Sequence, residues 1–458
     1  MPQNKAFYFS SNMLQLLWVK KMTKEYGLDE EKIIEISKYK KEPKWMTDFR
    51  LKAYKTFKEM PDPDFGPEID LDFDSLNYFK TVTKDTKAAR TWDECPIKDT
   101  FAEIGLIDAE KKYLDGIGAQ YESEVVYQSM IKELEEKGVI FCSMDEALQK
   151  HPDIFKKYFN TLIPYNDNKY AALNGAVWSG GTFIYVPPHV TIERPLQAYF
   201  RIDTKNMGQF ERTLIIVDED SHVHYMEGCT ATYHTTGSLH AAVVEVFVEK
   251  NASCRFTTIQ NWANNIYNLV TERAQVEENG TMEWIDGNIG AKINMKYPSC
   301  ILKGQGASGS CISVAVASNG QYQDAGAKAI HLAPNTTSNI VSKSIAANGG
   351  VANYRGKVYI DKAAENAKSI IKCDTILLDK HSKSDTIPTN IVDNPTSYLE
   401  HEATVSKLDE EKLFYLMSRG LNEDRAKELL IIGFIDEFRE NLPMEYAVEL
   451  NALLKNYF

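Results

Sequence analysis

Residues 240–260 read HAAVVEVFVEKNASCRFTTIQ, two short apolar runs separated by a polar corner. Each run alternates in hydrophobicity with period two, and the corner carries turn-forming residues, which is typical of strand, turn and strand. Runs of this kind recur from about residue 174 to about residue 399, separated by Gly, Asn and Asp: Thr182–Val186, Tyr199–Ile202, Thr213–Val217, His240–Val248, Arg255–Gln260, Cys311–Ala317, Lys357–Ile360 and Ile370–Leu378. The pattern predicts an all-β body.

Three all-β architectures are compatible with many short strands joined by small residues: a sandwich, a propeller and a parallel β-helix. Hairpin signals such as Asn-Gly between matched strands are few, and no blade-length repeat is present. We therefore favour a mainly β fold with a parallel β-helix core over residues 166–402.

The flanks of this core read as helix. Residues 1–165 form a helical N-terminal region, and residues 403–458 form a C-terminal helical region. The expected helices are Asp29–Tyr39, Lys44–Glu59, Ser123–Lys137, Asp409–Ser418, Asn422–Glu437 and Met444–Lys455, with a proline-rich loop over Met60–Asp74. The C-terminal helices are suited either to docking a partner or to capping the open end of the core.

The composition is that of a globular protein: 458 residues, 43% hydrophobic and 26% charged, with a net charge of −13. Disordered, collagen-like and low-complexity classes are excluded. The acidic balance argues against binding to nucleic acid or to anionic membranes, because phosphate groups are met by Lys and Arg.

The seven cysteines are scattered, and the closest pair, Cys300 and Cys311, is 11 residues apart. Without a C-x-x-C pair, zinc ribbons, thioredoxin-type redox pairs and a self-contained ferredoxin cluster are not expected. The set is typical of reduced thiols in a cytosol-like compartment. The N-terminus shows neither a secretory signal nor a membrane anchor.

Two local motifs are interpreted as structural. Gly304-Gln-Gly-Ala-Ser-Gly309 matches G-x-G-x-x-G, but a strand follows it where a dinucleotide site needs a helix, so we expect a turn. His222 and His224 share a strand face and could bind a metal, yet no third ligand is near, so a structural role is favoured. No G-x-x-x-x-G-K-[ST] sequence occurs, so the chain has no P-loop of its own.

The segments around Cys373 and Glu402 contain several side chains that could bind a metal. Ile371-Lys-Cys373-Asp-Thr375 reads as a strand, and Glu400-His401-Glu402 places two carboxylates and an imidazole in three consecutive residues. Sulfur, nitrogen and oxygen ligands together suit iron, whereas a strand cysteine is commonly a small core residue. From these residues alone, metal ligation and a solvated turn both remain open.

Several blocks closely resemble the SufB family, the scaffold subunits of the Suf iron–sulfur cluster assembly system. The resemblance runs from about residue 20 to the end. It is carried by Gly118-Ala-Gln-Tyr-Glu-Ser-Glu124, Gly208-Gln-Phe-Glu-Arg-Thr213, Glu227-Gly-Cys-Thr-Ala231, Gln260-Asn-Trp262, Lys372-Cys-Asp374 and Leu399-Glu-His-Glu-Ala-Thr404.

The resemblance implies a right-handed β-helix whose C-terminal helices bind the SufC-like ABC ATPase. The end of the β-helix would pair with a SufD-like paralogue, or with a second SufB copy, and a transient iron–sulfur cluster would be built at that interface. Sulfur would come from SufS/SufE-like or SufU-like donors, and reduced flavin (FADH2) is a candidate electron source. Such a protein is an assembly scaffold rather than an enzyme, and it resides in the cytoplasm or in the stroma of an organelle.

The resemblance also assigns roles to individual residues. Cys373 and Glu402 would be cluster-site residues, with Glu400 and His401 shaping that site and a histidine added from the SufD-like chain. Cys229 would accept sulfur, and a polar path to the cluster site would use Arg201, Gln260 and Trp262. The residues expected to dock the ATPase are Leu413, Leu416, Leu429, Leu430 and Phe434.

Two positions depart from the family pattern. Asp203 stands where an asparagine is frequent, and Glu272 stands where a lysine is expected. Both add negative charge along the sulfur path, so the path is less firmly implied than the cluster site. One alternative is a pectin-lyase-type enzyme, for which neither a cleft of several Asp or Lys/Arg residues on one strand face nor a secretion signal is apparent. The other is a SufD-like partner, against which the presence of Cys373 with Glu402 argues.

Overall fold

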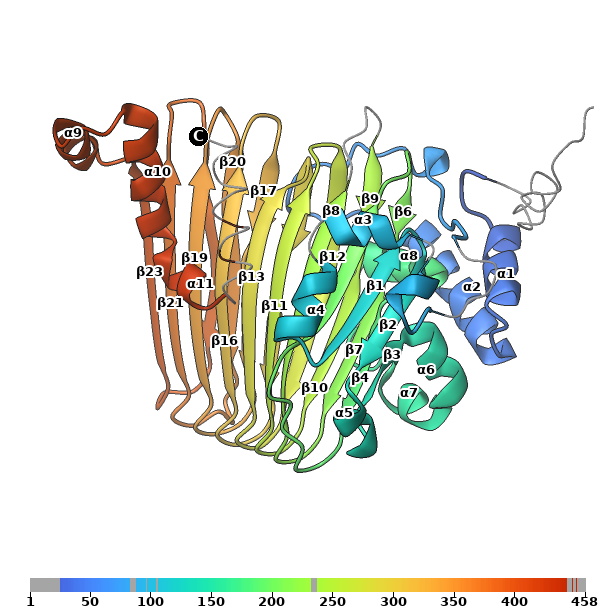
Figure 1. The fold of residues 1–458 in the computed structure, drawn as a ribbon. Helices are drawn as coiled ribbons and strands as arrows, with labels where there is room; N and C mark the ends of the chain where they lie inside the picture. The colour runs from blue at the N-terminus through green and yellow to red at the C-terminus, as the bar shows by residue number, and fades with distance from the viewer. Residues whose placement is uncertain are drawn as a thin grey trace, which may run out of the picture.

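The computed structural model describes residues 25–82, 88–95, 97–103, 106–231 and 237–442, together with residues 447 and 450. The chain winds into a parallel β-solenoid of about 8 turns, with helices at both ends (Figure 1). The expected mainly β fold with a parallel β-helix core is thus confirmed. The helix predicted over Met444–Lys455 lies almost entirely outside the described residues.

One side of the solenoid is a ten-stranded sheet, here sheet 1, in the order β2-β1-β5-β8-β11-β13-β16-β19-β21-β23. All neighbours are parallel except the β1–β2 hairpin. The strands are β1 (Gly116–Tyr121), β2 (Glu124–Met130), β5 (Leu196–Ile202), β8 (His222–Ala231), β11 (Ser253–Trp262), β13 (Thr281–Gly290), β16 (Ser308–Ala317), β19 (Thr337–Ala346), β21 (Lys368–Leu377) and β23 (Tyr398–Lys407).

The opposite side, sheet 2, has thirteen strands, with β14-β17-β20-β18-β15-β12-β10-β7-β4-β3 as its main path. In addition β22 pairs with β20, and β9 joins β6 to β12. The strands are β3 (Ile140–Ser143), β4 (Thr182–Val186), β6 (Gly208–Gln209), β7 (Arg212–Val217), β9 (Ser238–His240), β10 (Val243–Val248), β12 (Ile266–Val276), β14 (Ile293–Lys296), β15 (Ser299–Leu302), β17 (Tyr322–Ala325), β18 (Lys328–His331), β20 (Val351–Ile360) and β22 (Thr386–Val392).

A column of left-handed residues marks one corner of successive coils. Asp220, Asn251, Asn279, Asn335 and Asn366 all have φ between 52° and 58°. Asn and Asp tolerate this conformation better than other side-chain-bearing residues. The Asn251 amide also donates to Asp220 in the next coil at 2.9 Å, so the corner is stabilised from coil to coil. Asn251, which lies in the opening 240–260 stretch, is one of these corner residues.

Helices cover the outer face of sheet 2 at the N-terminal end of the solenoid (Figure 1). They are α1 (Glu30–Tyr39), α2 (Lys44–Glu59), α6 (Met144–Lys150), α7 (Pro152–Tyr158) and α8 (Lys169–Val177). Ile33, Ala53 and Leu173 of three of these helices share an apolar cluster with Tyr267 and Leu269 of β12. The two longest of these helices, α1 and α2, coincide with the predicted segments except that α1 begins one residue later.

The predicted helix over Ser123–Lys137 is wrong in its first half. Glu124–Met130 form β2, and only Lys132–Glu136 form a helix, α5. Its apolar residues are buried by pairing with β1 through a turn in which Glu122 has φ 54°, so tertiary pairing overrides the local helical spacing. The first strands of both sheets therefore lie before residue 166, next to α3 (Lys98–Glu103) and α4 (Leu106–Tyr113).

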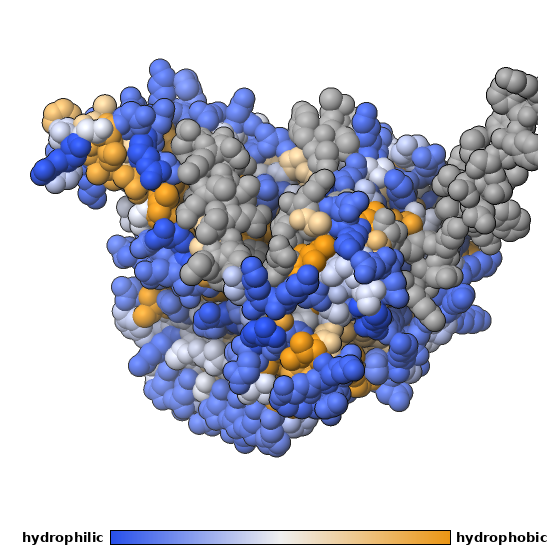
Figure 2. All heavy atoms as spheres, viewed as in Figure 1, coloured by the Kyte–Doolittle hydropathy of each residue, from blue (hydrophilic) through white to orange (hydrophobic). Residues whose placement is uncertain are grey.

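The C-terminal helices pack on the outer face of sheet 1. Ile431 and Ile435 lie against Ile285 and Val314 of the sheet, so α10 (Glu423–Phe434) and α11 (Asp436–Glu440) are anchored by buried apolar side chains. By contrast α9 (Glu410–Ser418) has no buried residue and projects beyond the last coil (Figure 1). Figure 2 shows apolar side chains gathered over α9 and α10. No helix among the described residues is long and apolar enough to cross a bilayer.

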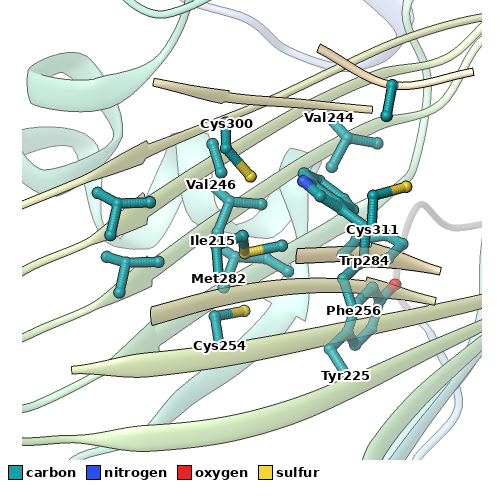
Figure 3. Close-up of a cluster of buried hydrophobic side chains, with 14 of the residues drawn as sticks. Ile215, Tyr225, Val244, Val246, Cys254, Phe256, Met282, Trp284, Cys300 and Cys311 are labelled. Carbon is teal, nitrogen blue, oxygen red and sulfur yellow. The ribbon is translucent and has the colours of Figure 1, made fainter. Parts of the chain in front are cut away.

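The interior of the solenoid is filled by alternate residues from both sheets. Five of the seven cysteines belong to this buried cluster: Cys229, Cys254, Cys300, Cys311 and Cys373. Figure 3 shows Cys254, Cys300 and Cys311 around Met282 and Trp284 in the middle of the solenoid. All seven cysteines are buried and free of disulfides.

Candidate functional site

The last two strands of sheet 1 bring Cys373 and His401 together. Cys373 of β21 pairs in register with Ala403 of β23, and the Cys373 Sγ lies 3.4 Å from the His401 Nε2. Both side chains have the parity of the solenoid interior, and Cys373 is only 3% exposed. Burial raises the pKa of the Cys373 thiol to about 12 and lowers the pKa of His401. A neutral imidazole and a thiol that must lose a proton are the forms from which a metal site is built.

Glu400 and Glu402 lie on the other face of β23. Glu402 pairs with Lys372 and Glu400 with Ile370, and all four side chains are exposed. Because side chains alternate across a strand, these carboxylates point away from the Cys373 thiol. Of the four residues expected at the cluster site, the structure therefore brings two together, and Glu402 is not one of them.

Tyr354 lies beside this pair from sheet 2. Its hydroxyl is buried without a hydrogen-bond partner, and its ring contacts that of His401 edge-on, with 6.3 Å between centroids. Burial, followed by the nearby thiols of Cys373 and Cys311, raises the pKa of Tyr354 well above 10. Asn390 of β22 approaches the other ring nitrogen of His401 at 3.3 Å. The pocket of Cys373 thus contains a phenol and an amide that the sequence did not reveal.

Cys229 lies inside the solenoid on β8, between Phe200 of β5 and Gln260 of β11 in register. It is 2% exposed. Burial, followed by the charges of Glu227 and Glu211, raises the pKa of this thiol well above 9, and Lys296 opposes that shift. Cys229 and Cys373 are five strands apart in sheet 1, which is roughly 24 Å at about 4.8 Å per strand.

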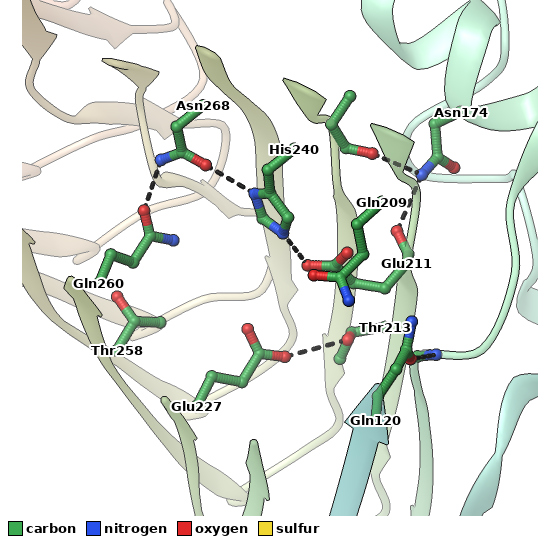
Figure 4. Close-up of polar contacts among 12 residues, drawn as sticks. Gln120, Asn174, Gln209, Glu211, Thr213, Glu227, His240, Thr258, Gln260 and Asn268 are labelled. Atoms are coloured by element: carbon green, nitrogen blue, oxygen red, sulfur yellow. Dashed lines mark hydrogen bonds and ion pairs between the residues drawn. The ribbon is translucent and has the colours of Figure 1, made fainter. Parts of the chain in front are cut away.

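Figure 4 shows a chain of buried polar side chains that includes Gln260, which lies in register beside Cys229. The Glu211 carboxylate contacts one nitrogen of His240, and the Asn268 Oδ1 lies 2.6 Å from the other. Asn268 donates to Gln260, and the Trp262 Nε1 also donates to Gln260, at 3.3 Å. Two of the three predicted path residues, Gln260 and Trp262, therefore meet in the interior.

Arg201, the third predicted path residue, does not lie in the interior with Gln260 and Trp262. It pairs in register with Thr230, on the face of sheet 1 opposite to Cys229. Its guanidinium is bound by Asp203, with 2.9 Å between Nε and Oδ2. The aspartate found in place of the family's asparagine therefore neutralises Arg201 outside the interior.

A buried ion cluster continues the polar interior. The Lys296 Nζ lies 2.7 Å from Asp286, 3.1 Å from Glu272 and 2.9 Å from the hydroxyl of Thr258. Burial raises the pKa of Glu272 to about 8. The charge of Lys296 opposes this rise, and the charge of Asp286 adds to it. For Lys296 the effect of burial is outweighed by Asp286 and Glu272, so its pKa is raised. Glu272 is thus paired with a lysine of β14, the strand next to β12 in sheet 2.

Several polar atoms of this interior have no protein partner, including Oε2 of Glu211, Oε2 of Glu272, Nδ2 of Asn294 and Oε1 of Gln323. A buried polar atom without a partner costs about 1–3 kcal/mol. The interior therefore has capacity for water or for polar cargo.

The C-terminal residues predicted to dock a partner differ in exposure. Leu429, Leu430 and Phe434 line a cavity of about 650 Å³ between α10 and the outer face of β21 and β23. Leu429 is exposed, whereas Leu413, Leu416, Leu430 and Phe434 are half-buried. The most exposed apolar side chains are Phe414 at 73% and Tyr415 at 55%, which the helical spacing did not single out.

The two motifs interpreted as structural are integrated into the solenoid. Gly304–Ala307 form the turn before β16, which begins at Ser308, so the turn is followed by a strand as predicted. His222 and His224 are hydrogen-bonded to Ser253 at 2.7 Å and to Thr257 at 2.9 Å. Among the described residues, no group of three or more His, Cys, Asp or Glu side chains is placed to hold a metal ion. A cluster on Cys373 and His401 needs ligands from elsewhere.

The interior residues Lys296, His240 and Asn268 were missed by the sequence analysis. Their signal is a polar residue at an inward position of an otherwise apolar strand, such as Lys296 in Ile293–Lys296. That signal can be recognised only when it is known which strand positions face the solenoid interior.

Comparison with known proteins agrees with this architecture. The model of the SUF system FeS cluster assembly SufBD core domain matches residues 200–434, and the model of the SufBD protein N-terminal region matches residues 120–198. Iron–sulfur cluster assembly SufBD family proteins of Staphylococcus aureus strain USA300 and Staphylococcus epidermidis strain ATCC 12228 are each 59% identical over 434 residues. These cover 94% of this chain and 93% of each relative. The chain belongs to the SufBD family of iron–sulfur cluster assembly proteins.

Proposed function

We propose that this chain is the SufB-type scaffold of its system, which accepts sulfur at Cys229 and builds an iron–sulfur cluster at Cys373. One observation carries the proposal: the Cys373 thiol lies 3.4 Å from the His401 imidazole on the last two strands of sheet 1. A thiol and an imidazole at the end of a solenoid form half of a ligand set that a second chain can complete.

The end of the solenoid supports a partner at this position. In the described chain β23 has no neighbour beyond it in sheet 1, so its backbone groups are free to pair. Apolar side chains are exposed on this strand and on β22, namely Tyr398, Val405, Ile391 and Val392. A SufD-like paralogue or a second copy of this chain would cover this edge and add the missing ligands.

Sulfur entry is a transfer between thiols. The Cys229 thiolate attacks the terminal sulfur of a donor persulfide, an S–S bond forms at Cys229 and breaks at the donor, and the donor leaves as a thiolate. No net oxidation occurs in this step. Incorporation of that sulfur as sulfide then requires two electrons per sulfur from a co-reductant, for which reduced flavin (FADH2) is the candidate.

The polar interior supports a route between the two cysteines. A persulfide is an anion, and Lys296 is a buried cation whose charge opposes the rise that burial causes in the pKa of Cys229 and of Cys311. Gln260 lies in register beside Cys229, and Asn268 links Gln260 to Asn294 of β14, the strand that carries Lys296. We assign Lys296 the role that the family pattern gives to a lysine at position 272.

In this proposal ATP is hydrolysed by a SufC-like ATPase that docks on α9 and on the cavity beside α10. The exposed Phe414 and Tyr415 supply apolar area for that contact. The chain itself then acts as a scaffold without a turnover reaction of its own.

The experiment that tests the proposal is anaerobic reconstitution with iron and sulfide in the complex with the paralogue, followed by visible absorbance. The parent should form a cluster and Cys373→Ala should not. A SufD-like role would instead leave cluster yield unchanged in Cys373→Ala, because the ligands would come from the other subunit.

A further inference from the structure

A cavity of about 470 Å³ lies on the outer face of sheet 2, on the side opposite to the cysteines of the solenoid interior. Its walls are the loop Met60–Phe65, the first residues of α8, and outward positions of β12, β15 and β18. A volume of this size suits a small organic molecule. None of the roles discussed above uses it.

Basic side chains cross the sheet at this cavity in one row. Arg273 of β12 pairs with Ser299 of β15, Ser299 with Lys328 of β18, and Lys328 with Lys357 of β20. Like charges on neighbouring strands repel one another, so such a row is stabilised by a bound anion.

Three of the four carboxylates that line the cavity are engaged by other cations. Asp167 binds Arg273 at 2.9 Å, Asp62 binds Lys169 at 3.0 Å and Glu272 binds Lys296 at 3.1 Å. Asp64 is exposed on the loop and makes no ion pair within the described part of the chain. The Lys328 ammonium group, although half-buried, makes no ion pair or hydrogen bond within the described part of the chain. Burial, and then the charge of Arg273, lowers the pKa of Lys328, and the charge of Asp167 opposes this shift only in part.

One aromatic ring, that of Tyr297, lies beneath this cation, and the neighbouring ring of Phe65 is covered by the Arg355 guanidinium at 5.1 Å. The Lys328 Nζ is 5.1 Å from the centroid of the Tyr297 ring, and the ring of Phe65 meets that of Tyr297 edge-on at 5.9 Å. The cavity therefore combines a desolvated ammonium group with a planar apolar wall. An ammonium group binds phosphate as a point charge, and ring faces favour planar partners.

We propose that this cavity binds a phosphorylated small molecule with a planar ring, of mononucleotide size. Its phosphate would contact Lys328, and its ring would lie against Phe65 and Tyr297. This inference is independent of the cluster site and of the proposed scaffold function.

The test is calorimetric titration of the full-length chain with AMP, adenosine and inorganic phosphate. We expect AMP to bind more tightly than either fragment, and Lys328→Gln to weaken AMP binding by at least about tenfold. Lys357→Gln is the matched control, because Lys357 belongs to the same row but does not line the cavity, and it should change AMP binding by less than about twofold.

Phe65→Ala tests the contact with the ligand's ring separately from the contact between Lys328 and its phosphate. Phe65 is 37% exposed on a loop, so its removal leaves the fold intact, and it should weaken AMP while leaving inorganic phosphate unchanged. Folding of Lys328→Gln is not at risk, since a half-buried cation is removed, and its thermal midpoint should equal or exceed that of the parent. Absence of AMP binding to the parent, or equal losses in Lys328→Gln and Lys357→Gln, would overturn the proposal.

Discussion

Cys373 and His401 face each other across the last two strands of sheet 1, with 3.4 Å between Sγ and Nε2. The neighbouring Glu402 pairs with Lys372 on the opposite face. The one-residue offset between His401 and Glu402 decides which group can share a metal with the thiol from within this chain. It also makes the roles of these residues separable by substitution.

Cys373→Ser should abolish cluster formation, because a serine alkoxide is a poor iron ligand at neutral pH. Since Cys373 is buried in the interior cluster, the change should also lower stability, by about 1–3 kcal/mol. Visible absorbance after reconstitution and thermal unfolding measure the two effects. Cys254→Ser is the matched control, because Cys254 is an equally buried interior thiol; its cluster yield should stay at the parental level. Parental yield in Cys373→Ser would refute the site.

His401→Ala should reduce cluster yield more than Glu402→Ala when this chain is reconstituted without its paralogue. The imidazole already touches the thiol, whereas the Glu402 carboxylate can reach a cluster only from the outer face. In the complex, Glu402→Ala tests the family's assignment, since a solvated carboxylate would be silent there. A silent His401→Ala together with a severe Glu402→Ala would show that the outer face carries the cluster.

Cys229→Ser should lose uptake of labelled sulfur from a cysteine desulfurase system but retain chemical reconstitution with free sulfide. Cys229 lies on β8 and Cys373 five strands away, so the two thiols can serve separate steps. Labelled persulfide is followed by gel autoradiography after trapping. Equal uptake in variant and parent would move the entry point to another thiol.

Between pH 5 and pH 8 the parent should lose roughly 1–3 kcal/mol of folding stability through Glu227, and Glu227→Gln should remove this loss. Burial, followed by the charge of Glu211, raises the pKa of Glu227 to about 7, so the folded state binds more protons than the unfolded state from about pH 4.5 to about pH 7. The parent therefore loses stability as pH rises through this range. A glutamine keeps an oxygen for Thr213 and Tyr225 but cannot ionise.

Chemical denaturation at the two pH values measures this difference, with the exposed Glu219→Gln as control. An unchanged pH profile in Glu227→Gln would show that Glu227 does not carry the effect.

Phe414→Glu with Tyr415→Glu should abolish co-purification of the ATPase without changing the unfolding midpoint, because neither side chain is buried. Ile435→Ala is the contrasting variant. Ile435 is fully buried against sheet 1, so this change should cost about 2–5 kcal/mol and act through stability. Retained ATPase binding in the double variant would place the docking surface elsewhere.

The period-two runs and small-residue corners were sufficient to predict strands from residue 174 onward, because alternation directly reflects one buried and one outward face. The asparagine column at Asn251, Asn279, Asn335 and Asn366 was also present in the sequence and would have given the coil length. The helix expected over Ser123–Lys137 failed because the burial of Val126 is decided by pairing with β1 rather than by local spacing.

The sequence by itself determined the β-solenoid class and its flanking helices, since each rests on local pattern or on a motif, and it predicted a role for Cys373. Tertiary structure alone decided that His401 rather than Glu402 meets the thiol, because a shift of one residue in strand register exchanges the two faces. It also decided that Lys296 compensates Glu272, since the two residues are 24 positions apart (296 − 272) and meet only where β12 and β14 lie side by side. Contacts between coils depend on winding, which no single segment encodes.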